Sequence, residues 1–187
     1  MIDKSFWNDA LRDGAIVGCV MSLSRIAESY MMILSDMPLN TMSVVSCVEM
    51  LLAAGIFIWL VYRFARRRSA SSDASVGYSY GSGVLHIFVI SLLAGIVVGL
   101  ANSLFIAAIG YDAYVEGYVA RIGQLASLVP SSEQMFTTLI DEIESSSAPT
   151  VFDNIIGSMN SYIITGGILA FAIAGMVRRD PKIENRE

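Results

Sequence analysis

Residues 84–109 have the sequence VLHIFVISLLAGIVVGLANSLFIAAI, which contains no Asp, Glu, Lys or Arg. A helix needs about 20 mainly apolar residues to cross the hydrocarbon core of a bilayer, and this stretch is long enough. Because lipid offers no partners for backbone groups, a helix, which bonds its own backbone, is the expected form. The stretch therefore predicts a membrane-spanning helix.

Three further apolar runs lie at residues 14–34, 44–64 and 155–177. Together with residues 84–109 they predict an all-α fold, an integral membrane four-helix bundle made of two hairpins. We expect a single membrane domain over residues 1–187. The composition agrees, because 55% of the residues are hydrophobic and only 16% are charged, against about 25% charged in soluble domains. This excess of apolar surface argues against a soluble enzyme and against a disordered protein.

The connections between the expected spans differ in length and composition. The first is a short turn, whereas residues 65–83 form a basic, then Ser- and Gly-rich link that we expect to be a flexible hinge. Residues 110–154 form a long acidic loop with one or two short helices. We expect residues 111–129 to continue the third span beyond the lipid, and a second, serine-capped helix to end near Ser145.

Basic residues outside the spans gather at the two ends of the chain and in the link after the second span. They are Lys4, Arg12, Arg63, Arg66, Arg67, Arg68, Arg178, Arg179, Lys182 and Arg186. The acidic loop contains Arg121 as its basic residue. Because basic residues stay on the cytoplasmic side, we expect a multi-pass protein of the bacterial inner membrane with both termini cytoplasmic. The net charge of −5 argues against a nucleic-acid partner.

The sequence has no recognisable catalytic or metal-binding motif. One histidine, His86, and two cysteines, Cys19 and Cys47, do not make a metal-ligand set. We therefore expect no metal, no cofactor and no enzymatic activity. His86 is expected to be a polar residue near the membrane surface. Both cysteines are expected to be free, buried thiols near opposite leaflets.

Polar side chains inside the apolar runs are the main candidates for a site. Arg25 and Glu28 lie three residues apart on one face of the first span, and Glu49 lies in the second. Charges inside a membrane are costly and usually face the bundle interior, so we predict one polar cluster that opens outward. Its members are Arg25, Glu28, Glu49, Asn102, Asn160 and Thr165. A structural ion pair and a ligand or ion site are both compatible with this pattern.

Small residues at four-residue spacing mark the expected helix contacts. They are Gly14 and Gly18, Gly95 and Gly99, and Gly166 and Ala170. Such faces let two helix backbones approach closely within a membrane. They serve either packing within one bundle or contact between two copies of the chain.

Three stretches together cover much of the chain and carry a family resemblance. They are SFWNDALRDGAIVGCV at residues 5–20, YSYGSGVLHIFVISLLAGIVVGL at residues 78–100 and GSMNSYIITGGILAFAIAGMVRRDP at residues 157–181. They resemble a family of small bacterial membrane proteins, found mainly in Bacteroidetes and described as domain of unknown function 4199. The resemblance implies a four-helix inner-membrane protein with no established activity or catalytic residues. It also hints at envelope glycan chemistry, through polyprenyl-phosphate sugar transferases that members often neighbour.

Two functions of different classes fit these observations. The first is a non-enzymatic scaffold or regulator of a membrane partner complex. The second is a small transporter or lipid carrier that uses Arg25, Glu28 and Glu49. A closed, tightly packed Arg–Glu contact would support the first, and a water-filled pocket joining these charges to the outside would support the second. The expected partners are membrane lipids and either a membrane protein or a second copy of the chain.

Overall fold

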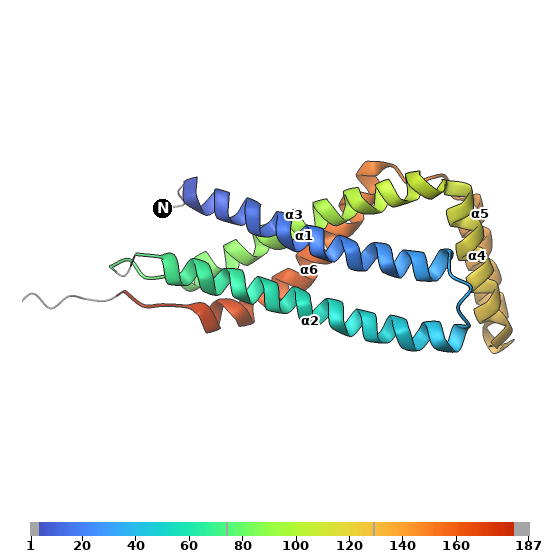
Figure 1. The fold of residues 1–187 in the computed structure, drawn as a ribbon, viewed down its shortest axis with the longest axis horizontal. Helices are drawn as coiled ribbons and strands as arrows, with labels where there is room; N and C mark the ends of the chain where they lie inside the picture. Colours follow the sequence, from blue (N-terminus) through green and yellow to red (C-terminus); the bar gives the residue numbers. More distant parts are fainter. Residues whose placement is uncertain (1–3, 74, 129, 182–187) are drawn as a thin grey trace, which may run out of the picture.

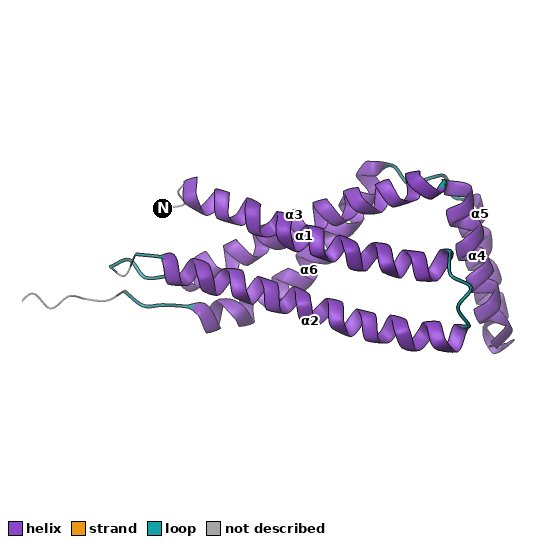
Figure 2. Cartoon of the chain, viewed as in Figure 1, coloured by secondary structure: helices purple, strands orange, loops and turns teal. Residues whose placement is uncertain are grey.

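The computed structural model describes residues 4–73, 75–128 and 130–181, which form helices and no strand. The elements are α1 (Lys4–Ile33), α2 (Leu39–Ser71), α3 (Tyr80–Ile109), α4 (Tyr111–Leu128), the short 3-10 helix η1 (Pro130–Ser132), α5 (Glu133–Ser145) and α6 (Val151–Val177). Four long helices form the bundle, and α4 and α5 lie across one end of it (Figure 1, Figure 2). We call this end the α4–α5 end and the opposite one the α2–α3 end. The predicted all-α fold is confirmed.

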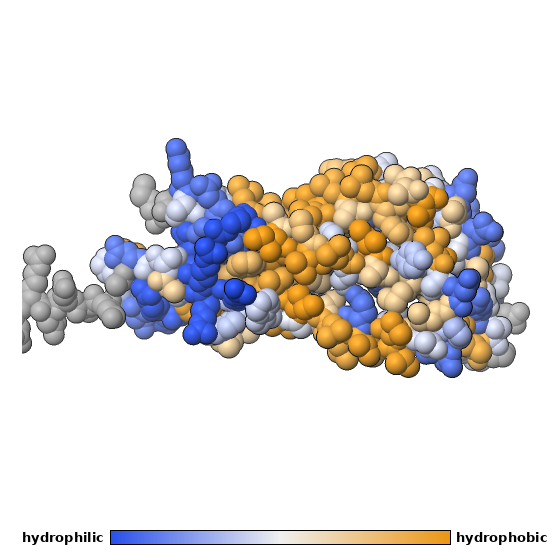
Figure 3. Space-filling model, viewed as in Figure 1, coloured by the Kyte–Doolittle hydropathy of each residue, from blue (hydrophilic) through white to orange (hydrophobic). Residues whose placement is uncertain are grey.

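The helices α1, α2, α3 and α6 are long and apolar enough to cross a membrane. Figure 3 shows the matching surface on one face of the bundle, an apolar band between two hydrophilic ends. The helices extend beyond the predicted spans, since α1 begins at Lys4 and α2 continues to Ser71. Hydropathy marks only the part of a helix that suits lipid, whereas backbone hydrogen bonds continue the helix into water.

The central helix is α3, which packs most extensively against α6 and α1. Glycines make both contacts close. A Cβ atom added to Gly99 would lie 2.5 Å from Cα of Ile155, and one added to Gly14 would lie 2.7 Å from Cβ of Leu93. Both distances are far below van der Waals contact, so a larger residue would push the helices apart. In this arrangement α1 packs mainly on α3, not on its hairpin partner α2.

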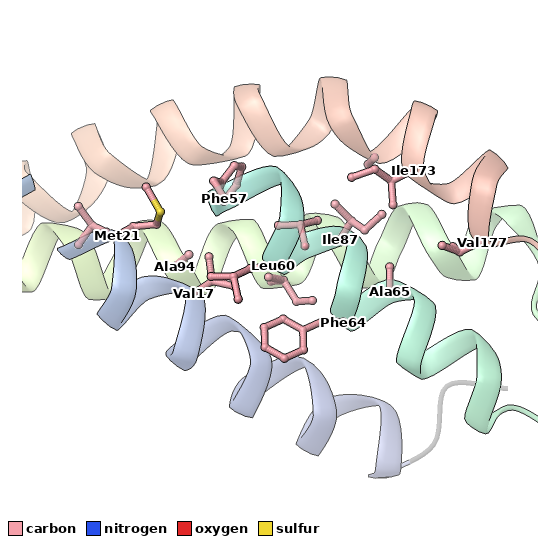
Figure 4. Packing of buried hydrophobic residues seen from close by; sticks show 14 of the residues in the cluster. Val17, Met21, Phe57, Leu60, Phe64, Ala65, Ile87, Ala94, Ile173 and Val177 are labelled. Atoms are coloured by element: carbon pink, nitrogen blue, oxygen red, sulfur yellow. The ribbon is translucent and has the colours of Figure 1, made fainter. Parts of the chain in front are cut away.

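The apolar core lies in the half of the bundle near the α2–α3 end, where the four long helices meet (Figure 4). α1 contributes Val17, α2 contributes Phe57 and Val61, and α3 contributes Ile87. Val17, Val61 and Ile87 have no exposed surface. Between helices in lipid, such close van der Waals packing is a main source of stability.

In the other half of the bundle, α2 departs from its neighbours. No α2 residue between Met42 and Phe57 is buried, whereas every turn from Phe57 to Ala65 contains a buried side chain. Figure 1 shows α1 and α2 separating toward the α4–α5 end. The resulting space contains the candidate site.

The acidic loop folds across the α4–α5 end. Gly110 has a φ of 87°, a left-handed conformation that favours glycine, and it ends α3. α4 turns away at this residue, so the prediction that residues 111–129 continue the third span is wrong. Ser132 stands at the start of α5, as expected, although its side chain caps no described backbone group.

Arg121 fastens α4 to the turn between α1 and α2. Its buried guanidinium donates hydrogen bonds to the carbonyl oxygens of Met32 at 3.2 Å and Met37 at 3.0 Å, and to that of Ser35. These carbonyls lie at and just beyond the C-terminus of α1, where helix carbonyls lack partners and cations are favoured. Arg121, the basic residue of the acidic loop, therefore holds α4 against the turn between α1 and α2.

The link between α2 and α3 is bonded to the segment that follows α6. Backbone groups of Tyr78 and Arg179 bond each other at 2.7 and 3.0 Å, and the Arg179 guanidinium donates to the carbonyl oxygen of Ser72 at 2.9 Å. The predicted hinge is therefore shorter than expected. Residues up to Ser71 belong to α2, and α3 begins at Tyr80.

His86 has no exposed surface, so it is buried inside the bundle near the α2–α3 end. Its Nε2 lies 3.8 Å from Oδ2 of Asp13, which is also buried and accepts a hydrogen bond of 2.8 Å from Arg12. Nearby, Arg68 of α2 donates to Asp9 of α1 at 2.5 Å. These polar contacts join α1, α2 and α3 at the α2–α3 end.

Candidate functional site

A cavity of about 730 Å³ lies between α1, α2, α3 and α6, in the half of the bundle near the α4–α5 end. We call it the cleft. Five members of the polar cluster predicted from the sequence line it, namely Arg25, Glu28, Glu49, Asn102 and Thr165. Figure 3 shows a hollow between α1 and α2, with hydrophilic atoms inside it and apolar atoms around its edge. Polar groups in a concave site within an apolar band make the cleft the main candidate for a binding site.

The cleft ends where the apolar core begins. Phe57 of α2 packs edge-on against Tyr162 of α6, with ring centroids 5.4 Å apart at an interplanar angle of 79°. Met21 and Val98 also line this part of the cleft and pack into the core. This layer separates the cleft from the α2–α3 end.

Arg25 and Glu28 form an ion pair on the α1 wall of the cleft. Nη1 of Arg25 donates to Oε2 of Glu28 at 2.7 Å, as expected for side chains three residues apart on a helix. The two side chains are 43% and 48% exposed. The pair is therefore open to the cleft and is not a sealed structural contact.

Glu49 lies on the α2 wall of the cleft and accepts a hydrogen bond from the hydroxyl of Ser24 on α1. Its side chain is partly exposed, and no ion pair joins it to any described basic residue. A carboxylate at this depth needs donors, water or a cation around it. Ser24 supplies one neutral donor.

Amide and hydroxyl groups on α3 and α6 form the remaining wall. Nδ2 of Asn102 donates to Oδ1 of Asn154 at 3.0 Å, and Thr165 lies farther along the same wall. Asn160 is exposed and does not line the cleft, unlike the other predicted members of the cluster. Successive residues of a helix are rotated by about 100°, so Asn160 points away from the face that contains Ser161.

Several polar residues of the cleft were not predicted. They are Ser24, Ser46, Asp153, Asn154, Ser158, Ser161 and Tyr162. On α6, positions 154, 158, 161 and 165 follow the spacing of one helix face, and this periodicity is the signal that could have revealed them. Serines in a span are easily passed over because they often bond their own helix, as Ser161 does with the carbonyl of Gly157 at 3.1 Å.

The charges that line the cleft do not balance. Arg25 is the guanidinium among the lining residues, and Glu28, Glu49 and Asp153 are the carboxylates. Glu28 is paired with Arg25, and Asp153 forms a capping box with Thr150 at the start of α6. Glu49 is thus the lining carboxylate that neither an ion pair nor a helix cap engages.

An apolar groove of about 370 Å³ adjoins the cleft. Its wall is a row of side chains on α2, namely Val44, Val45, Val48, Leu52 and Ile56. Ser24, Glu49 and Ala53 line both the groove and the cleft. A polar space and an apolar space that meet at one carboxylate match the two parts of an amphipathic molecule.

α4 carries a row of tyrosines beside α1. Tyr114 stacks between Tyr111 and Tyr118, with ring centroids 6.5 and 5.6 Å away. Burial raises the pKa of Tyr114, and the positive charge of Arg25 opposes this rise.

The small residues predicted at helix contacts lie within the bundle. Gly14 and Gly18 of α1 contact α3, Gly95 and Gly99 of α3 contact α6, and Gly166 and Ala170 of α6 are buried. These faces are therefore occupied by helices of the same chain, so a contact with a second copy would need another surface.

Two further kinds of group, metal ligands and thiols, are relevant to the cleft. Over the described ranges, no group of three or more His, Cys, Asp or Glu side chains is placed to hold a metal ion. Cys19 and Cys47 are free, as predicted, but both are exposed on the bundle and not buried in it. Cys47 lines the cleft, whereas Cys19 does not.

Comparisons of the chain with protein-family models, with curated proteins and with solved structures find no match in any of the three. Fold alone does not define a function, so the function is argued from the groups that line the cleft.

Proposed function

We propose that the protein is a small membrane carrier that takes an amphipathic molecule from the bilayer through the side of the bundle. The cleft is the observation that carries this proposal, because about 730 Å³ of space lined by charged and hydroxyl groups lies within an apolar band. A structural ion pair alone would need no such space. The open Arg25–Glu28 pair favours the carrier over a closed scaffold.

The cleft and the apolar groove offer sites for the two parts of a lipid-like ligand. Arg25, Glu28 and Glu49 provide donors and acceptors for a head group, and the groove along α2 accommodates an alkyl chain. Because α1 and α2 separate in this half of the bundle, a ligand can enter by lateral movement within the bilayer. The layer at Phe57 blocks further movement, so transfer to the other leaflet requires α2 to leave the core there.

A movement assay in vesicles tests this function. The vesicles contain a lipid with a fluorescent label on its acyl chain, which leaves the head group unmodified, and dithionite destroys the label in the outer leaflet only. We expect the protein to expose labels from the inner leaflet. Ser161→Trp, which fills the cleft, should abolish this movement, and Asn160→Trp, at an exposed position outside the cleft, should preserve it. Equal activity of the two variants would contradict a role for the cleft.

The proposed orientation places the α2–α3 end in the cytoplasm of a bacterial cell and the α4–α5 end outside the inner membrane. The basic residues around Arg66 and Arg178 at the α2–α3 end support this orientation. Alkaline phosphatase fused after Ser146 should be active, and a green fluorescent protein fused after the last residue should fluoresce. The reverse pattern would overturn the orientation.

A second function, as a scaffold for a membrane partner, is favoured by a separate surface. Met135 and Leu139 on α5 are 61% and 39% exposed at the α4–α5 end. An envelope glycan enzyme, which the family resemblance implies, is a candidate partner. Serine at both positions should then reduce copurification of that partner and leave lipid movement unchanged.

A further inference from the structure

The charges of the cleft point to the class of head group that it selects, and this inference rests on the proposed function. We infer that the ligand has a positively charged ammonium head group, which Glu49 binds, and an alkyl chain, which lies in the apolar groove along α2.

Glu49 is the carboxylate available to a ligand. The carboxylate of Asp153 accepts from the backbone N–H and the hydroxyl of Thr150 at 2.9 and 2.7 Å, and Glu28 is held by Arg25 at 2.7 Å. Glu49 has the Ser24 hydroxyl as its described hydrogen-bond donor. A carboxylate accepts about four hydrogen bonds, so acceptor capacity remains for an ammonium group.

The position of the apolar groove sets the direction of the alkyl chain. Glu49 lines both the cleft and the groove, so a head group bound there leaves its chain directed along Val48, Leu52 and Ile56. A free inorganic cation would make no use of this groove. A metal ion is also a poor fit, because the described residues place no three His, Cys, Asp or Glu side chains together.

An anionic head group would meet carboxylates in the cleft and no unpaired basic residue among those that line it. Arg25 is the basic residue that lines the cleft, and Glu28 already neutralises it. Glu49 and Asp153 would repel a phosphate. Phosphate-headed lipids are therefore the competing ligands that the experiment must include.

Three amphiphiles with the same octyl chain separate these possibilities. The full-length protein in lipid nanodiscs is titrated with octylammonium, octyl phosphate and octyl glucoside, and empty nanodiscs give the background. We expect octylammonium to bind about tenfold more tightly than the other two. Glu49→Gln should remove this preference, Glu49→Asp should retain part of it, and Glu116→Gln on α4, outside the cleft, should leave it unchanged.

The possible results separate a failure of the ammonium assignment from a failure of the proposed carrier function. If none of the amphiphiles binds above background, the proposed carrier function fails together with the inference. If the three bind equally, or octyl phosphate binds most tightly, only the ammonium assignment fails. If Glu49→Gln does not fold, the comparison of head groups on the unmodified protein still decides the question.

Discussion

The hydroxyl of Ser24 on α1 donates a hydrogen bond to the carboxylate of Glu49 on α2, and both residues line the cleft. In this half of the bundle no α2 residue between Met42 and Phe57 is buried. The bond therefore joins two helices where packing does little, and it places the carboxylate beside both the cleft and the apolar groove.

Ser24→Ala removes this bond without adding bulk. We expect the free energy of unfolding in detergent to fall by about 1 kcal/mol, since hydrogen bonds to charged groups contribute more than neutral ones but Glu49 is partly exposed. Ser161→Ala is the matched control, because the Ser161 hydroxyl bonds only its own helix. Its effect should stay below about 0.5 kcal/mol. A smaller loss for Ser24 than for Ser161 would mean that the bond does not form.

Arg121→Gln should loosen the turn between α1 and α2. The guanidinium is 6% exposed and donates to carbonyl oxygens of Met32, Ser35 and Met37, which the shorter glutamine does not reach together. We expect a loss of about 2–3 kcal/mol and faster amide hydrogen exchange over residues 34–38. Arg178→Gln, which breaks an exposed ion pair with Asp180, should change neither quantity measurably.

Three of the four charged residues of the cleft could be predicted from sequence, whereas most of its neutral residues could not. Arg25, Glu28 and Glu49 are conspicuous because a charge within an apolar run has few tolerable positions. Ser158 and Ser161 carry no such signal, because a hydroxyl can bond its own backbone and face lipid equally well. Their place in the cleft depends on how α6 is rotated against α3.

The contacts of residues near helix ends were harder to predict from the sequence than those of the serines. Asn154 precedes the predicted span at residues 155–177, so its contact with Asn102 was missed. Asp13 and its contact with His86 were missed for the same reason, because hydropathy places the start of the first span at Gly14. The turn at Gly110 depends on a positive φ, which a glycine permits but does not require.

Gly99→Ala tests whether the small-residue faces serve packing within one chain. The added methyl group would lie 2.5 Å from Cα of Ile155, so α6 must shift away from α3. We expect a loss of about 1–3 kcal/mol in the free energy of unfolding. Gly175→Ala is the control, since nothing lies within 4 Å of its added Cβ, and it should gain about 0.5–1 kcal/mol from helix propensity. Unchanged stability of Gly99→Ala would instead leave this face free for a second copy.

Tyr78 should make the stability of the α2–α3 end depend on pH in the alkaline range. Its side chain is 4% exposed, and burial raises its pKa to about 12, with Arg68 opposing the rise. The pKa of an unfolded tyrosine is about 10, so the stabilising difference is complete below pH 10 and is lost as the pH rises toward 12. We expect a loss on the order of 2 kcal/mol over this interval, measured by unfolding at successive pH values. Tyr78→Phe should reduce this fall, Tyr80→Phe at an exposed position should retain it, and an identical fall in both variants would assign the effect to another group.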